Sequence, residues 1–157
     1  MNYSLAIGII CLIFSILISL ELSKKFTDRR KFFTDFYDFN QILINEIYFS
    51  KKTIPYIINE NFKDDSLFYK LLKEYFIEKK IEFKNVHFLT EKENALLNKY
   101  IEGLGSTDVK SQESYFLEVR SQIKPILDEV DELEKRNKSL YVKIGFLIGF
   151  SILIVLM

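Results

Sequence analysis

Five carboxylates crowd into seven consecutive residues ahead of the last apolar run of the chain: Asp128, Glu129, Asp131, Glu132 and Glu134. In a helix, three of them have a basic residue one turn later, which favours a solvated face of ion pairs. The expected pairs are Asp131 with Lys135, Glu132 with Arg136, and Glu134 with Lys138. The alternative is that Asp128, Glu129 and Glu132 dock a basic surface of a partner protein.

No serine, cysteine or histidine residues are arranged as a catalytic or metal site. The chain has one cysteine, Cys11, and one histidine, His87, so neither an internal disulfide nor a cysteine-based metal site can form. The Gly-Leu-Gly run at 103–105 is too short to cradle a phosphate group. We therefore expect no enzymatic activity, no cofactor and no small-molecule substrate. The 22 basic and 22 acidic residues cancel, which argues against binding to nucleic acid.

Two apolar runs, one at each end of the chain, are candidates to cross a bilayer. The first, from Ser4 to Leu22, would span about 27 Å as a helix. A cleaved signal peptide is the alternative, but no basic residue precedes the run and no small-x-small cleavage site follows it. The second run begins at Ile144 and needs the three residues at 140–142 to reach the required length. We predict spans over residues 1–22 and 140–157, joined by a helical domain over residues 23–139.

Basic residues flank both runs on the side that faces the middle of the chain. They are Lys24, Lys25, Arg29, Arg30 and Lys31 after the first run, and Lys135, Arg136 and Lys138 before the second. Because basic residues stay on the cytoplasmic side of a membrane, the middle of the chain is expected in the cytoplasm and both termini outside it. The predicted location is the cell membrane, with two spans.

Small residues mark where the two spans could meet. Gly145 and Gly149 form a G-x-x-x-G pair in the second span. The first span carries a stripe of small residues at helical spacing: Gly8, Cys11, Ser15 and Ser19. Small residues let helix backbones approach closely in lipid. We predict that the spans pack together as a hairpin; self-association of the second span is the alternative.

The spacing of apolar residues predicts an all-α fold, an antiparallel bundle of about five helices. One apolar stripe continues from the first span: Phe26, Phe33, Phe36, Phe39, Leu43 and Ile47. A second, at alternating steps of three and four with only Asn137 polar among its positions, forms a seam that runs into the second span: Phe116, Val119, Ile123, Ile126, Val130, Leu133, Leu140 and Ile144. Between them, Thr90 and Glu93 have the spacing of a capping box, which predicts a helix start.

Two glycines predict the corner before the final helix. Gly103 is expected to stop the preceding helix by adopting a left-handed conformation, and Gly105 to let the chain reverse. Thr107 or Asp108 then caps the helix that follows.

The corner also carries a recognisable pattern. Leu104-Gly105-Ser106-Thr107-Asp108, followed by Gln112, resembles the L-G-x-S-D-x-x-x-Q signature of the stage III sporulation protein AB family. Threonine stands where that family usually has serine. The segment Glu46-Ile47-Tyr48, with Thr53 and Pro55 after it, is similar to another conserved segment of the family. The stretch between Tyr75 and Phe88 is shorter than usual and lacks the expected tryptophan.

We interpret the signature as a conformational motif that shapes a corner, instead of a binding site. Its members are Gly103, Leu104, Gly105, Thr107, Asp108 and Gln112. The cap should contribute about 1 kcal/mol.

The resemblance implies a role without catalysis. The family is related to the inner-membrane platform (F-type) proteins of type II secretion and type IV pilus systems. It implies a platform or scaffold subunit of the sporulation channel between mother cell and forespore, in the mother-cell membrane around the forespore. The implied partners are a secretion-type ATPase in the cytoplasm and other subunits of the channel. The alternative is a small pore-forming hairpin protein, similar to a holin or a toxin, with the helical domain as its regulator.

Overall fold

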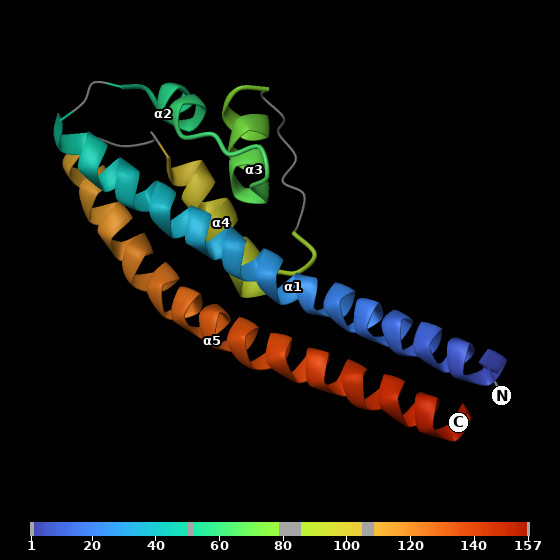
Figure 1. Cartoon of the computed structure of the whole chain (residues 1–157). Coiled ribbons are helices and arrows are strands. Elements are labelled where there is room, and N and C mark those ends of the chain that lie inside the picture. Colours follow the sequence, from blue (N-terminus) through green and yellow to red (C-terminus); the bar gives the residue numbers. More distant parts are fainter. Residues whose placement is uncertain (1, 50–51, 79–85, 105–108, 157) are drawn as a thin grey trace. The chain divides into compact units, whose positions relative to one another are not determined.

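The computed structural model describes residues 2–49, 52–78, 86–104 and 109–156. This part of the chain contains only α-helices and irregular segments, so the predicted all-α fold is confirmed. The helices are α1 (Asn2–Phe49), α2 (Ile54–Glu60), α3 (Leu67–Phe76), α4 (Glu91–Gly103) and α5 (Val109–Leu156) (Figure 1). The first and the last each contain 48 residues without a break.

The chain divides into two compact units. The terminal unit consists of Met1–Arg30 and Glu129–Met157, and the central unit of Lys31–Asp128. Because α1 and α5 pass through the limits between them, each of these helices belongs to both units.

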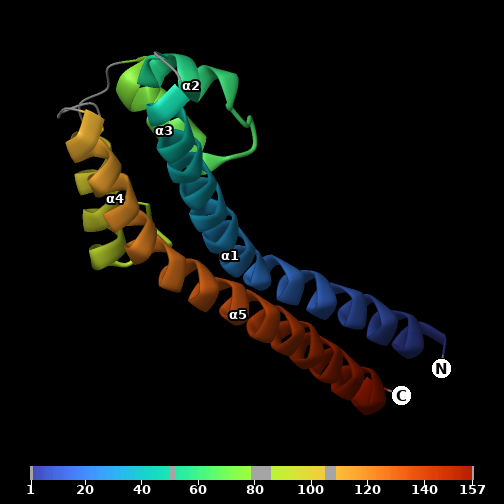
Figure 2. The same cartoon turned by 90° about the vertical axis from the view of Figure 1, so that its left-hand side faces the viewer.

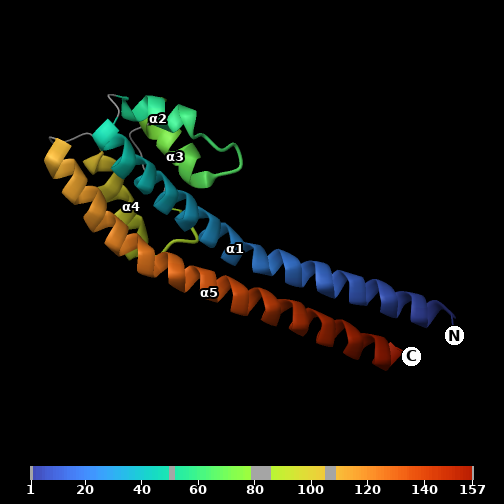
Figure 3. The same ribbon diagram turned by 60° about the vertical axis from the view of Figure 1, so that its left-hand side comes forward.

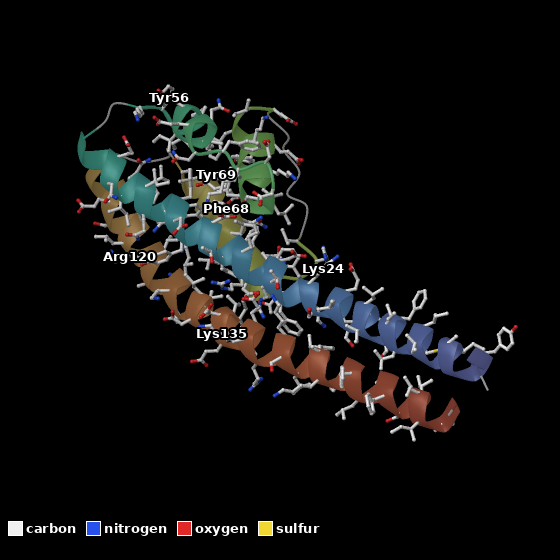
Figure 4. All side chains as sticks on the ribbon, in the orientation of Figure 1. Lys24, Tyr56, Phe68, Tyr69, Arg120 and Lys135 are labelled. Atoms are coloured by element: carbon white, nitrogen blue, oxygen red, sulfur yellow. The ribbon has the colours of Figure 1, made fainter. Side chains whose placement is uncertain are left out.

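Aromatic rings fill the core of the central unit. Phe33, Phe36 and Phe39 of α1 are at most 1% exposed, which confirms the predicted core stripe at these positions. The neighbouring Phe32 is also buried, whereas Phe26 is partly exposed. The ring of Phe36 stacks on Phe68 of α3 at 5.0 Å and meets Tyr100 of α4 at 4.7 Å, measured between ring centroids. Phe68 and Tyr69 lie on the inner side of α3 (Figure 4). Several helices therefore share one aromatic core. Within the central unit, α2, α3 and α4 lie beside the second half of α1 and the first half of α5 (Figures 2 and 3).

Local sequence signals fix the ends of the short helices. Thr90 and Glu93 form the predicted capping box of α4: the Glu93 N–H donates to Thr90 Oγ1 at 3.3 Å, and the Thr90 N–H donates to Glu93 Oε2 at 2.8 Å. Ser66 caps α3 by accepting from the Tyr69 N–H at 3.3 Å. Pro55 occupies the first turn of α2, where its missing N–H costs nothing.

In the terminal unit, the first half of α1 and the second half of α5 lie side by side and antiparallel (Figures 1 and 3). Each contains an apolar stretch long enough to cross a membrane, of which only 17% in α1 and 11% in α5 is buried. The core helix of a soluble protein would be mostly buried, so these two helices fit a membrane protein.

The predicted apolar seam of α5 is right as far as Val130, which is 2% exposed, and wrong at Leu140 and Ile144. Phe116, Val119 and Ile123 are at most 2% exposed, whereas Leu140 is 47% and Ile144 43% exposed. Among the residues beyond Val130, the buried ones are instead Glu134, Gly145 and Gly149. This pattern is the one expected of helices in a membrane, because lipid accepts large apolar side chains and leaves small residues to form the contact between helices.

Candidate functional site

The terminal unit brings Gly145 of α5 against two serines of α1. The Ser15 hydroxyl donates a hydrogen bond to the Gly145 carbonyl oxygen at 2.7 Å. A Cβ atom at Gly145 would lie 2.1 Å from Ser19 Oγ and 3.1 Å from the Ser15 carbonyl oxygen. Only glycine therefore fits at this position without a shift of α1.

The other glycines of the terminal unit differ in how closely they are packed. A Cβ at Gly149 would lie 2.9 Å from the Cα of Leu12, a backbone atom that cannot rotate away. A Cβ at Gly8 would lie 3.4 Å from the Cα of Leu153, which is close to an ordinary contact. Gly8, Ser15, Gly145 and Gly149, the residues expected to pack the spans, thus all lie between α1 and α5.

A group of polar side chains joins the same two helices nearer the central unit. We call it the boundary cluster: Thr27 and Arg30 of α1, with Asp131 and Glu134 of α5. Arg30 Nε lies 2.8 Å from Asp131 Oδ1 and its Nη1 lies 3.3 Å from Glu134 Oε2, while the Thr27 hydroxyl donates to Glu134 Oε1 at 2.8 Å. The side chain of Glu134 is only 10% exposed. The cluster holds the two helices in one register.

The cluster corrects one of the expected ion pairs. Glu134, predicted to pair with Lys138 on a solvated face, is buried between the helices and bound by α1. Asp131 does pair with Lys135 as predicted, at 2.5 Å. The hydrogen bond from Lys135, with Arg30 close by, holds the pKa of Asp131 below its usual value.

Sequence reasoning missed Thr27 and Arg30 as site residues. A signal for Thr27 was present, because Ser15, Ser19, Ser23 and Thr27 follow one another at steps of four along α1. Ser19 and Ser23 are 7% and 3% exposed, so this face continues from the small-residue stripe.

The three carboxylates predicted to dock a partner have different surroundings. Asp128 accepts a hydrogen bond from Lys124 Nζ at 2.7 Å. Glu129 and Glu132 line an open depression of about 360 Å³ together with Leu133, Lys135 and Arg136. Two cations thus offset the two carboxylates there, and the docking role stays a prediction.

The signature corner contains an unexpected close contact. Gly103 is the last residue of α4, and its backbone is not left-handed, contrary to expectation. Instead, a Cβ there would lie 2.7–2.9 Å from the outer ring atoms and hydroxyl of Tyr115 in α5. The Tyr115 hydroxyl donates to the Lys99 carbonyl oxygen at 2.9 Å. A side chain at Gly103 would displace the tyrosine ring that covers it.

The remaining members of the signature are only partly described. Leu104 is 6% exposed and Gln112 is partly buried. Gly105, Thr107 and Asp108 lie outside the described residues, as do the reversal and the helix cap expected of them.

A family model describes the chain from the end of α2 onward. The model for stage III sporulation protein AB matches residues 63–157. The chain belongs to this family. Searches of the curated proteins and of the solved structures found no significant match.

The sporulation family match covers α3, α4 and α5. It therefore includes Gly103, Tyr115 and the α5 half of the boundary cluster. The segment from Glu46 to Pro55, whose pattern is also similar to the family, precedes the matched residues. Family membership gives the chain a role in sporulation.

The described part of this sporulation protein contains no group of three or more His, Cys, Asp or Glu side chains that could hold a metal ion. His87 is exposed, with its ring 5.2 Å from that of Phe88.

Proposed function

We propose that this sporulation protein is a platform subunit without catalytic activity, which links a cytoplasmic ATPase to a membrane assembly between mother cell and forespore. It sits in the mother-cell membrane around the forespore, with the central unit in the cytoplasm and both termini on the other side. Its partners are a secretion-type ATPase and other membrane subunits of the channel.

The continuity of α1 and α5 is the observation that carries this proposal. Each is one helix of 48 residues, which contains both an apolar stretch and part of the central core. A force applied to the central unit can therefore reach the membrane through helix backbone, without a flexible linker that would absorb it. The boundary cluster adds that the two helices move together, because sliding one past the other would separate Arg30 from both carboxylates.

Co-purification from sporulating cells tests the proposed partners. The tagged full chain is solubilised with detergent, and the expected result is recovery of a secretion-type ATPase. A variant with Asp128→Lys, Glu129→Lys and Glu132→Lys tests the docking surface and should lose the ATPase. The matched control reverses three exposed carboxylates of the central unit, Asp38, Asp64 and Glu102, and should keep it. Retention of the ATPase by the folded docking variant would remove these three residues from the interface.

Reporter fusions test the proposed orientation separately. A reporter active only outside the cytoplasm is inserted after Ser4, at Asn85 or at the C-terminus. Activity at the two ends and silence at Asn85 are expected. Activity at Asn85 would place the central unit outside the cytoplasm, where it could not meet an ATPase.

The pore-forming alternative requires a different arrangement of side chains in the terminal unit. A pore needs polar side chains on a face that several hairpins can turn toward a common channel. The Ser15 hydroxyl, however, is bound to the Gly145 carbonyl oxygen inside the hairpin, and large apolar side chains occupy the outside. This arrangement supports the platform. Overproduction of the chain should therefore leave cells impermeable to small dyes, whereas rapid dye entry would favour the pore.

A further inference from the structure

Charges of opposite sign are separated in the terminal unit. The sequence mixes acidic and basic residues beside both expected spans, but the side chains of Asp131 and Glu134 are turned toward α1, where they are 30% and 10% exposed. Lysines nearby are turned outward: the side chain of Lys24 is 64% exposed and that of Lys135 is 73% exposed (Figure 4). The outer surface is thus more basic than the sequence indicates.

Four exposed lysines of this unit lie within one narrow band next to the spans. They are Lys24 and Lys25 of α1 with Lys138 and Lys143 of α5, which we call the lysine collar. The antiparallel pairing sets their level, because the ring of Phe26 lies 5.8 Å from that of Tyr141, in the middle of the α5 segment between the last two lysines. Lys143 comes five positions after Lys138, a height of about 7.5 Å along a helix. This height is about equal to the Debye length in physiological salt, so all four charges act at the same membrane surface.

Less negative than positive charge lies at the level of the collar. Glu21 pairs with Lys24 at 2.5 Å, and the carboxylate of Asp28, four residues after Lys24, also acts on this lysine. The exposed carboxylate of Glu132 lies six residues before Lys138, farther from the spans. Four cations against two carboxylates leave a net positive charge where lipid headgroups would be.

We propose that the lysine collar binds the headgroups of anionic lipids and holds a shell of them around the two helices. Lysine ammonium groups on flexible stems reach phosphate as point charges and need no preformed pocket. Tyr141 beside the collar is a residue type that favours the boundary between lipid and water, which agrees with this depth. The inference rests on the terminal helices crossing a membrane, as in the proposed function. It goes beyond orientation, because basic residues that only orient a chain require no particular lipid afterwards.

Thermal unfolding of the full chain in lipid nanodiscs tests the proposal, because both faces of a nanodisc carry the same lipids and orientation has no influence. One set of discs contains phosphatidylcholine alone and the other an equal mixture with phosphatidylglycerol. The wild type should melt about 5 °C higher in the anionic discs, and high salt should remove most of this difference. A variant with Lys24→Gln, Lys25→Gln, Lys138→Gln and Lys143→Gln should lose at least half of it.

A matched variant removes four exposed cations from the central unit: Lys70→Gln, Lys92→Gln, Lys99→Gln and Arg120→Gln. It loses the same charge as the collar variant and should keep the full response to anionic lipid. Lipids that remain bound after extraction into detergent, identified by mass spectrometry, give a second measurement. The wild type and the matched variant should retain phosphatidylglycerol several-fold over phosphatidylcholine, and the collar variant should not.

Three results would overturn the proposal: an equal melting shift in the collar variant, no shift in the wild type, or the same shift from inorganic phosphate added to phosphatidylcholine discs. Each of these leaves the platform function standing. Failure of the wild-type chain to incorporate into nanodiscs at all would instead contradict the membrane location on which both proposals depend.

Discussion

Gly103, at the end of α4, is covered by the ring of Tyr115 from the second turn of α5. The hydroxyl oxygen, Cζ and Cε1 of this ring lie 2.7, 2.8 and 2.9 Å from the place that a Cβ on Gly103 would occupy. The ring also stacks on Tyr100 at 6.3 Å between centroids and binds the Lys99 carbonyl through its hydroxyl. Tyr115 therefore packs against the end of α4, and Gly103 is the surface on which its ring lies.

Gly103→Ala should lower the free energy of unfolding by about 1 kcal/mol, because the ring must swing away and give up its hydrogen bond to Lys99. In a Tyr115→Ala background the same change should be neutral or stabilising by up to about 0.5 kcal/mol, since alanine is the better helix former. Thermal unfolding of the full chain in detergent, followed by circular dichroism, measures both. An equal loss in the two backgrounds would mean that the ring is not what requires the glycine.

Gly149→Ala and Gly8→Ala are a matched pair within the expected spans. The first places a methyl group 2.9 Å from backbone in α1, and the second places it 3.4 Å from backbone in α5. Overpacking against backbone at Gly149 should lower the free energy of unfolding by about 1–3 kcal/mol, while Gly8→Ala should lower it by only about a few tenths of a kcal/mol. Melting temperatures in detergent compare the two. Equal effects would show that the helices pack at another angle or register.

The fold was largely predictable because its signals are local. The capping box of Thr90 and Glu93 and the phenylalanine stripe of α1 can be read from neighbouring residues, and both are present as predicted. The prediction of a buried seam fails at Leu140 because an apolar repeat indicates burial only for a helix in water. In a membrane helix, apolar side chains at the same spacing can point outward into lipid. Periodicity alone therefore cannot tell where the contact face of α5 changes.

The candidate site was less predictable because its partners are far apart in sequence. Glu134 has a basic residue four positions later, which is the pattern of an ordinary surface ion pair. Its actual partner Thr27 lies 107 residues away. Gly103 was singled out correctly but for the wrong reason, because the approach of Tyr115 depends on how α5 packs and has no local signal.

Glu134→Ala should destabilise the chain by about 1–3 kcal/mol, because it removes the buried acceptor of the Thr27 hydroxyl and one of the two carboxylates that bind Arg30. Glu132→Ala, two residues away and exposed, is the control and should have an effect within about 0.5 kcal/mol. Combining Arg30→Ala with Glu134→Ala in a double-mutant cycle should give a coupling of about 1 kcal/mol, since Arg30 is half exposed. Additive effects in the cycle would show that the two side chains do not interact in solution.

Two tyrosines of the central core predict a loss of stability in alkaline solution. Burial, with Asp35 and Asp38 nearby, raises the pKa of Tyr69 to about 12, and burial raises the pKa of Tyr100 well above its ordinary value. The ordinary value is about 10, so the unfolded chain releases these protons first. The stabilisation they provide is complete below about pH 10 and is lost as the pH rises toward and beyond about 12.

The variant Tyr69→Phe has no hydroxyl at this position to ionise, so it should weaken this alkaline loss of stability, measured as the fall in melting temperature against pH. Tyr56→Phe, at a position that is 54% exposed, controls for the removal of one tyrosine hydroxyl. If both variants follow the wild-type profile, ionisation of Tyr69 does not contribute to alkaline unfolding.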